Sequence, residues 1–314
     1  KNVDCEFYGS CKCMAKLLKG KTIWMPRSPV SKLSLIIAIL ASPYIMLRFF
    51  WKAWRLSKQN TLVYMHSLLE KIFMAPCLRF FNIPYIFVEH ATIGNWLYKN
   101  PLLSFYKRNL AYKRAKLITV SHLMAADLKE FKPVVIANAI NQKFISSKPR
   151  NNPKKILYIG RLTPDKGVDQ IVRSALDLQQ YQFVFIGNGP LAKQIKHAGF
   201  KLYQKMSHRK ILEYLKKVDL LLLPSSKKDP FGLTVLEAMS REIPSLISSK
   251  VGIKDYLKHK DSTFIIKNNL TDSIAEVFSE VEIYNKVKNN LEKHYRSFGY
   301  QYMATSYFKI FQKL

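Results

Sequence analysis

The sequence predicts an α/β protein built from two doubly wound, Rossmann-like domains. Short apolar runs alternate with helical patterns along most of the chain, which predicts parallel βαβ units. The chain has 314 residues, of which 48% are hydrophobic; this length is large for one core and suits two domains of about 150 residues each. A segment without apolar side chains, Ser146–Pro153, separates the two halves and predicts the domain junction.

Each half contains a series of predicted strands separated by helical segments. In the second half the strands are expected near residues 156–159, 183–186, 219–223, 245–248 and 263–266. In the first half they are expected, from a weaker pattern, near residues 22–25, 61–65, 84–88, 116–120 and 134–137. The near-continuous apolar runs of the second half are typical of parallel strands covered on both faces.

Two acids in one short loop are the most informative local feature. Asp229 precedes the turn Pro230-Phe231-Gly232, and Glu237 falls in the second turn of a helix that is expected to open near Leu233. Backbone N–H groups at a helix start favour an anion, and an acid one or two turns later can accept hydrogen bonds from sugar hydroxyls. The pattern suits a nucleotide sugar. The alternative is a capped amphipathic helix after a buried strand.

Two further loops follow predicted strands. The strand near 156–159 ends at Gly160 and is followed by Arg161 and Lys166, a cation pair placed to neutralise a diphosphate at the carboxyl end of a parallel strand. The alternative for these cations is a solvated loop in a lysine-rich chain. The strand near 183–186 ends in Gly187-Asn188-Gly189, where glycine lets backbone approach a ligand closely; alone, this pattern is weak.

In their order along the chain, which is the cation loop, the glycine loop and then the two-acid loop, the three segments resemble the retaining glycosyltransferases of family 4. The resemblance is firm over about residues 150–260 and loose before them, with Asp229 where Glu is usual and Glu242 where Gly is common. It implies the GT-B fold, two Rossmann-like domains facing across a cleft: residues 1–149 would bind the acceptor, residues 150–292 the donor, and a C-terminal helix over 293–314 would pack back onto the first domain. The implied donor-binding residues are Arg161, Lys166, Gly187, Asn188, Gly189, Phe231, Gly232, Leu233, Thr234 and Glu237.

The resemblance also implies the chemistry. His90, at the end of the strand near 84–88, and Asp229 are the expected catalytic residues; Glu89, Gly9 and Ser10 are expected on the acceptor side. Transfer would retain the anomeric configuration, without a metal or a cofactor, from a co-substrate that is expected to be a UDP- or GDP-sugar. The acceptor would be a glycan or a lipid-linked molecule, and the reaction would belong to the synthesis of a cell-envelope polysaccharide or glycolipid.

The charge balance predicts a polyanionic partner. The formal net charge is +30, and residues 1–150 hold 24 Lys and Arg against 6 Asp and Glu. Such a field attracts nucleic acid or anionic lipid. A basic amphipathic helix is expected over 106–116, and residues 33–54 are expected to form a buried or interfacial helix, because the fifteen uncharged residues between Lys32 and Arg48 fall short of the roughly twenty that a bilayer requires.

The expected location is therefore cytoplasmic, peripheral to the inner face of an anionic membrane. The cysteines, Cys5, Cys11, Cys13 and Cys77, lack zinc-site spacing and suit reduced thiols. A nucleic-acid-binding protein on a degenerate GT-B scaffold stays open, but it leaves the paired acids and paired cations without a purpose, and no specific nucleic acid is expected. An epimerase would need a Gly-x-Gly-x-x-Gly loop, which is not found.

Overall fold

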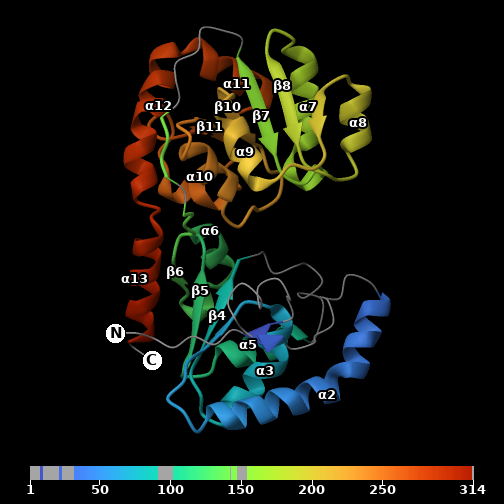
Figure 1. The fold of residues 1–314 in the computed structure, drawn as a ribbon, viewed down its shortest axis with the longest axis vertical. Helices are drawn as coiled ribbons and strands as arrows, with labels where there is room; N and C mark the ends of the chain where they lie inside the picture. Colours follow the sequence, from blue (N-terminus) through green and yellow to red (C-terminus); the bar gives the residue numbers. More distant parts are fainter. Residues whose placement is uncertain are drawn as a thin grey trace. The chain divides into compact units, whose positions relative to one another are not determined.

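The protein is an α/β structure with parallel sheets, as the sequence predicts (Figure 1). The computed structural model describes residues 8–9, 21–22, 32–90, 102–141, 143–146 and 154–312. Contacts divide the chain into two units, Lys1–Phe87 with Trp96–Lys116, and Val88–Asn95 with Leu117–Leu314. The expected junction at Ser146–Pro153 lies largely outside the described residues, so the division at 149/150 stays a prediction.

The second unit contains a six-stranded sheet with the order β12-β11-β10-β7-β8-β9, in which every neighbouring pair is parallel. Its strands are β7 (Lys155–Ile159), β8 (Gln182–Ile186), β9 (Lys201–Tyr203), β10 (Leu220–Leu223), β11 (Ser245–Ile247) and β12 (Phe264–Ile265). The five strands predicted for this half are present. The sequence analysis missed β9, because three residues at a half-buried sheet edge give almost no apolar pattern.

Helices surround this sheet in Figure 1 and bury its apolar residues. They are α7 (Val168–Asp177), α8 (Ala192–His197), α9 (His208–Leu215), α10 (Leu233–Met239), α11 (Leu270–Ser279) and α12 (Val281–Arg296), with the 3-10 helices η2 (Pro164–Lys166) and η3 (Gly252–Tyr256). In the central register Leu157 lies opposite Leu221 on one side and Val184 on the other, and all three are fully buried. Burial on both faces explains why these strands lack polar alternation.

The prediction of one C-terminal helix over 293–314 is wrong, because two helices share this segment. Residues up to Arg296 belong to α12, and a separate helix, α13 (Tyr300–Phe311), begins after Gly299. Gly299 has extended backbone angles, which interrupt the helical path. Tyr295 and Phe298 are buried in the core of the second unit. The packing of the terminal helix onto the first domain stays a prediction.

A four-stranded sheet with the order β3-β4-β5-β6 precedes the donor half. Its strands are β3 (Val63–Met65), β4 (Tyr85–Glu89), β5 (Ala115–Thr119) and β6 (Val134–Val135); β1 (Tyr8–Gly9) and β2 (Lys21–Thr22) form a separate parallel pair. Of the strand expected near 22–25, residues 23–25 lie outside the described residues. The other four expected strands are present.

The helices of this half are α2 (Lys32–Leu56), α3 (Leu68–Phe80), α5 (Leu102–Leu110) and α6 (His122–Ala125), followed by the 3-10 helix η1 (Ala126–Phe131). The basic helix expected over 106–116 is wrong: α5 ends at Leu110 and Lys116 lies in β5. The chain turns after Leu110: the Ala115 N–H donates to the Tyr112 carbonyl, and the Tyr112 hydroxyl and the Arg114 guanidinium both donate to Asn82. Among the described helices, none is both long and apolar enough to cross a membrane.

Candidate functional site

Loops from four neighbouring strands meet at one edge of the six-stranded sheet. β8, β7, β10 and β11 are adjacent in the sheet and parallel, so their carboxyl ends lie side by side. In open parallel sheets, ligands bind outside this edge. The loops that follow these strands contain the three predicted segments, and hydrogen bonds join them to one another.

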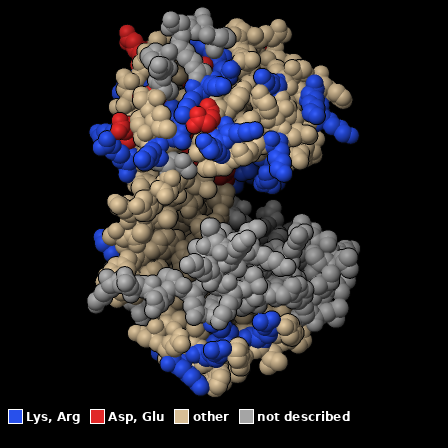
Figure 2. Space-filling model, viewed as in Figure 1, with Lys and Arg blue, Asp and Glu red and all other residues tan. Residues whose placement is uncertain are grey.

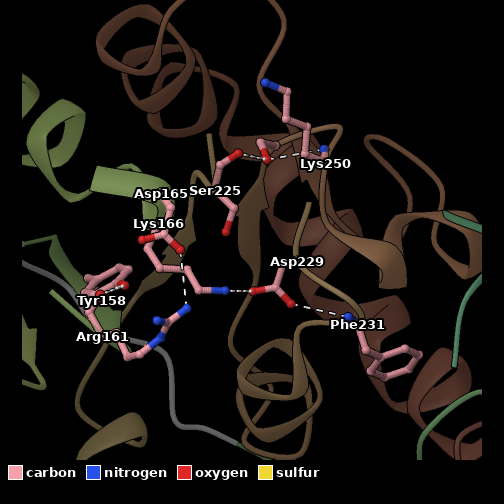
Figure 3. A network of polar contacts seen from close by, with 9 residues as sticks. Tyr158, Arg161, Asp165, Lys166, Ser225, Asp229, Phe231 and Lys250 are labelled. Carbon is pink, nitrogen blue, oxygen red and sulfur yellow. Dashed lines mark hydrogen bonds and ion pairs between the residues drawn. The ribbon is translucent and has the colours of Figure 1, made fainter. Parts of the chain in front are cut away.

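An ion pair between Lys166 and Asp229 lies at the centre of this edge (Figure 3). Lys166 Nζ is 2.6 Å from Asp229 Oδ2, and the two side chains are only 17% and 12% exposed. The other carboxylate oxygen accepts a hydrogen bond from the Phe231 N–H, at 3.2 Å. An ammonium has three donors and a carboxylate about four acceptor positions. Both groups therefore retain capacity for a ligand that approaches from solvent.

Gly167 makes this pair possible. It has φ +72°, ends η2 and begins α7; a Cβ at this position would lie 2.1 Å from the Pro224 carbonyl oxygen. Only glycine allows the loop after β7 to approach the end of β10 this closely. The N–H groups of Ser226 and Lys227 then donate to the Asp165 carbonyl. The result places Lys166, next in the chain, beside Asp229.

Arg161 is the solvent-facing cation of the site, with a side chain that is 69% exposed. Its guanidinium is 3.3 Å from Asp165 Oδ2, an exposed contact that contributes little to stability. Its backbone, in contrast, is held: the Tyr158 hydroxyl donates to the Arg161 carbonyl at 2.7 Å. Burial, and to a lesser degree the nearby Asp229 charge, raises the pKa of Tyr158, so this phenol remains a donor at neutral pH.

The loops after β7 and β8 form one continuous backbone surface. The Gly160 N–H donates to the Ile186 carbonyl at 3.0 Å, and the Leu162 N–H to the Asn188 carbonyl at 2.9 Å. A Cβ on Gly187 would lie 1.8 Å from the Gly160 carbonyl oxygen, and one on Gly189 would lie 2.5 Å from the Leu162 carbonyl oxygen. The glycines predicted as ligand contacts are thus also required for loop packing.

A segment from the end of β5 holds the loop with the first acid. Ser121 Oγ donates to the Pro230 carbonyl at 2.7 Å, and Asp229 forms an isolated parallel bridge with Val251. The Phe231 ring is buried against Tyr256 and points away from the Asp229 carboxylate in Figure 3. The side chain of Phe231 is therefore part of the core, and only its backbone faces the site.

The second acid lies in α10, as the sequence analysis predicts. Gly232, with φ +91°, precedes the helix; Leu233 is exposed and Thr234 half-buried. Glu237 Oε1 is 2.9 Å from Nε2 of His208, the first residue of α9. The carboxylate is mostly shielded while the imidazole is mainly exposed, so a ligand at this position meets both groups.

The predicted acceptor-side residues lie elsewhere in the chain. Glu89 is buried as the last residue of β4, and His90 follows it in an exposed position. Gly9 ends β1, while Ser10 lies outside the described residues. The relationship of these four residues to the donor loops stays a prediction.

Three polar residues of the site were missed by the sequence analysis. Ser225 lies two residues after the end of β10, and its buried Oγ has no hydrogen-bond partner among the described residues. A hydroxyl at the end of a predicted strand was a usable signal for it. Ser121 and His208 gave no local signal, because their partners Pro230 and Glu237 are 109 and 29 residues away in the chain.

Comparison with known proteins shows the family of the chain. The family profile described as "Glycosyl transferases group 1" matches residues 140–298, just over half of the chain. An uncharacterized glycosyltransferase of Methanocaldococcus jannaschii is 25% identical over 255 residues, covering 74% of this chain and 69% of that protein.

Two solved structures share the fold across nearly the whole chain. Anabaena HepE in complex with UDP and glucose has a TM-score of 0.75 at 15% identity and covers 96% of this chain and 89% of its own. The lipopolysaccharide outer core galactosyltransferase WaaB has a TM-score of 0.73 at 19% identity, with coverages of 99% and 90%. At these identities the likeness shows the fold alone. With the family profile, it establishes that the chain belongs to the group 1 glycosyl transferases and has their GT-B fold.

Proposed function

We propose that this glycosyltransferase moves a sugar from a UDP- or GDP-sugar to a glycan or lipid-linked acceptor, with retention of configuration and without a metal or a cofactor. The observation that carries the donor proposal is the Lys166–Asp229 pair, with Arg161 on the loop after β7 and Glu237 in α10, the helix that follows the Asp229 loop. Cations, shielded carboxylates and backbone N–H groups match the phosphates and hydroxyls of a nucleotide sugar.

In this proposal each group has a separate task. Arg161 and Lys166 bind the diphosphate, Asp229 accepts from hydroxyls of the transferred sugar, and Glu237 accepts from the ribose. Gly187, Asn188, Gly189 and the backbone from Phe231 to Thr234 line the donor. Because α10 has only seven residues, the proposal relies on the two cations for phosphate binding and not on the helix dipole.

The reaction breaks the bond between the anomeric carbon and the diphosphate, and forms a bond from that carbon to the acceptor oxygen on the same face. The leaving diphosphate gains negative charge, which Arg161 and Lys166 stabilise, and it takes the proton of the acceptor hydroxyl. His90 would face the transferred sugar, with Glu89, Gly9 and Ser10 on the acceptor side.

The proposed place of action is the cytoplasmic face of an anionic membrane, in synthesis of an envelope polysaccharide or glycolipid. Support comes from the excess of cations in the first 150 residues and from the likeness of the fold to WaaB, which acts on lipopolysaccharide outer core.

The first test is thermal stabilisation by a panel of UDP-, GDP- and ADP-sugars in EDTA, with the native chain and Glu237→Ala. A ligand at about one hundred times its dissociation constant adds about 2.7 kcal/mol to the free energy of unfolding. We expect stabilisation by one nucleotide class, lost in Glu237→Ala. Glu213→Ala is the matched control, because Glu213 forms only an exposed pair with Lys216.

The same experiment decides between the proposal and the alternative class. Stabilisation by no nucleotide sugar, together with tight, salt-sensitive binding to an oligonucleotide, would indicate a nucleic-acid-binding protein on a degenerate scaffold. Product analysis by NMR of the anomeric signal then tests retention.

A further inference from the structure

The exposed face of α2 is aromatic and basic. Tyr44, Leu47, Trp51 and Trp54 are all exposed, with Leu47 at 69% and Trp51 at 55%. Their spacing of three and four residues places them on one stripe of the helix. The opposite stripe contains Ile45, Phe49 and Ala53, which are buried, and α2 packs against α3. Between Tyr44 and Trp54 the helix therefore has apolar side chains on its exposed face as well as on its buried face.

Cations interleave with the aromatic rings on this stripe. Arg48 lies over the Tyr44 ring, Arg55 over the Trp51 ring at 4.9 Å, and Lys58 over the Trp54 ring at 3.8 Å. Each cation is exposed, and α2 contains no Asp or Glu. These contacts hold both partners on the solvent side of the helix.

The charge around α2 is strongly positive. The sequence contains no Asp or Glu between Glu6 and Glu70, and the first unit holds 19 Lys and Arg against 3 Asp and Glu. Figure 2 shows blue and no red side chains over the described part of the molecule where α2 and α3 lie in Figure 1. This excess of cations favours a negatively charged partner on the surface.

The apolar part of the stripe identifies the kind of anion. Trp and Leu side chains on the exposed face of one helix suit the boundary between lipid headgroups and acyl chains, where indoles favour the interface and cations contact lipid phosphates. Proteins that stack nucleobases place aromatic residues in a groove that follows the strand. An exposed aliphatic side chain such as Leu47 gains nothing from a phosphate backbone.

We infer that the Tyr44–Lys58 face of α2 is a docking surface for an anionic phospholipid bilayer, with the helix lying in the plane of the interface. This inference deepens the membrane part of the proposed function. The inference rests on the proposed function only for the purpose of the surface, which is to hold the enzyme at a membrane that contains a lipid-linked acceptor.

The test is co-sedimentation of the full chain with vesicles, without any nucleotide sugar. We expect binding to phosphatidylcholine vesicles that contain phosphatidylglycerol, weaker binding at high salt, and little binding to phosphatidylcholine alone. Trp51→Ser/Trp54→Ser should lower the affinity at least tenfold. Tyr300→Ser/Tyr302→Ser is the matched control and should bind as the native chain does, because these rings are also exposed, at 52% and 68%, but lie on α13.

The contribution of the cations is tested separately. Arg55→Gln/Lys58→Gln should weaken binding by about fivefold for each charge removed, whereas Lys193→Gln/Lys196→Gln on α8 should not. Circular dichroism and stabilisation by a nucleotide sugar show that each variant is folded. Equal vesicle binding by the double-Trp variant and the native chain, or a preference for a single-stranded oligonucleotide over the vesicles, would overturn the inference. Vesicle binding tests the α2 surface, and stabilisation by a nucleotide sugar tests the donor site. Each response can be lost while the other is kept, so the failure of one proposal is distinguishable from the failure of the other.

Discussion

Ser121 Oγ donates a hydrogen bond to the carbonyl of Pro230 at 2.7 Å, although 109 residues separate them in the chain. Pro230 lies between Asp229 and Phe231, so this bond fixes the backbone on which the first acid depends. A Cβ on Gly252 would lie 2.2 Å from the same carbonyl, so a third segment also contacts this point. The position of the acid is thus set from the end of β5 as well as from its own loop.

Ser121→Ala should weaken binding of a nucleotide sugar more than binding of the nucleotide alone, because Asp229 is displaced and Glu237 is not. Ser121 also caps α6 by accepting from the Met124 N–H, so a loss of about 1–2 kcal/mol in unfolding free energy is expected. Asn269→Ala removes the cap of α11, which has no contact with the donor in this proposal, and is the control. Calorimetry with both ligands checks the difference, and equal losses for the two ligands would contradict it.

Lys166→Met should abolish donor binding and destabilise the protein by about 1–3 kcal/mol, since Asp229 is left shielded without its cation. The double variant Lys166→Met/Asp229→Asn should recover most of the stability but none of the binding. Lys227→Met, at an exposed position in the adjoining loop, serves as control. Urea unfolding and titration with the donor measure the two effects; a stable single variant would argue against the pair as described.

Gly187→Ala should be among the most destabilising changes to the donor loops. Its Cβ would lie 1.8 Å from a backbone oxygen, and no side-chain rotation can relieve this clash. We therefore expect the free energy of unfolding to fall by about 3 kcal/mol or more. Gly299→Ala, whose nearest atom would be 3.5 Å away, should change stability by no more than about 1 kcal/mol. The urea midpoints of the two variants compare their stabilities. Similar midpoints would show that the loops after β7 and β8 can separate at little cost, which contradicts the prediction.

Stability should fall on acidification through His259. Its Nδ1 accepts from the Ile265 N–H at 3.0 Å, and burial, followed by the charges of Lys267 and Lys260, lowers its pKa below the ordinary value, with Glu276 and Glu280 acting in the opposite direction. Between the ordinary and the lowered pKa the unfolded chain binds more protons, so this contribution is complete above about pH 6.5 and is lost as the pH falls.

Urea unfolding at about pH 7.5 and pH 5.5 checks the histidine prediction. The difference in stability between the two pH values should be smaller in His259→Asn than in the native chain. His197→Asn, at an exposed position in α8, should leave the difference unchanged. An identical pH difference in His259→Asn would rule out this residue as a source.

The sequence predicted the second half well because its strands are nearly continuous apolar runs, and β7, β8 and β10 are followed by Gly160, Gly187 and Pro224. It also predicted Arg161, Lys166, Asp229 and Glu237 as one group, since parallel strands bring their carboxyl ends together. It could not predict contacts between distant segments: the Ser121–Pro230 bond and the His208–Glu237 pair have no local pattern. The expected helix over 106–116 failed because tertiary contacts at Asn82 outweigh helical spacing.

The ion pair between Lys166 and Asp229 also has a consequence for selectivity among the anions of a cell. Without a ligand, the cation is already neutralised by its own carboxylate, so inorganic phosphate that approaches Lys166 has to compete with Asp229 and offers that acid nothing in return. A molecule that presents phosphate and hydroxyl groups together satisfies both members of the pair at once. Discrimination against abundant simple anions thus follows from an internal competitor, before any contact with a base or a sugar ring is considered.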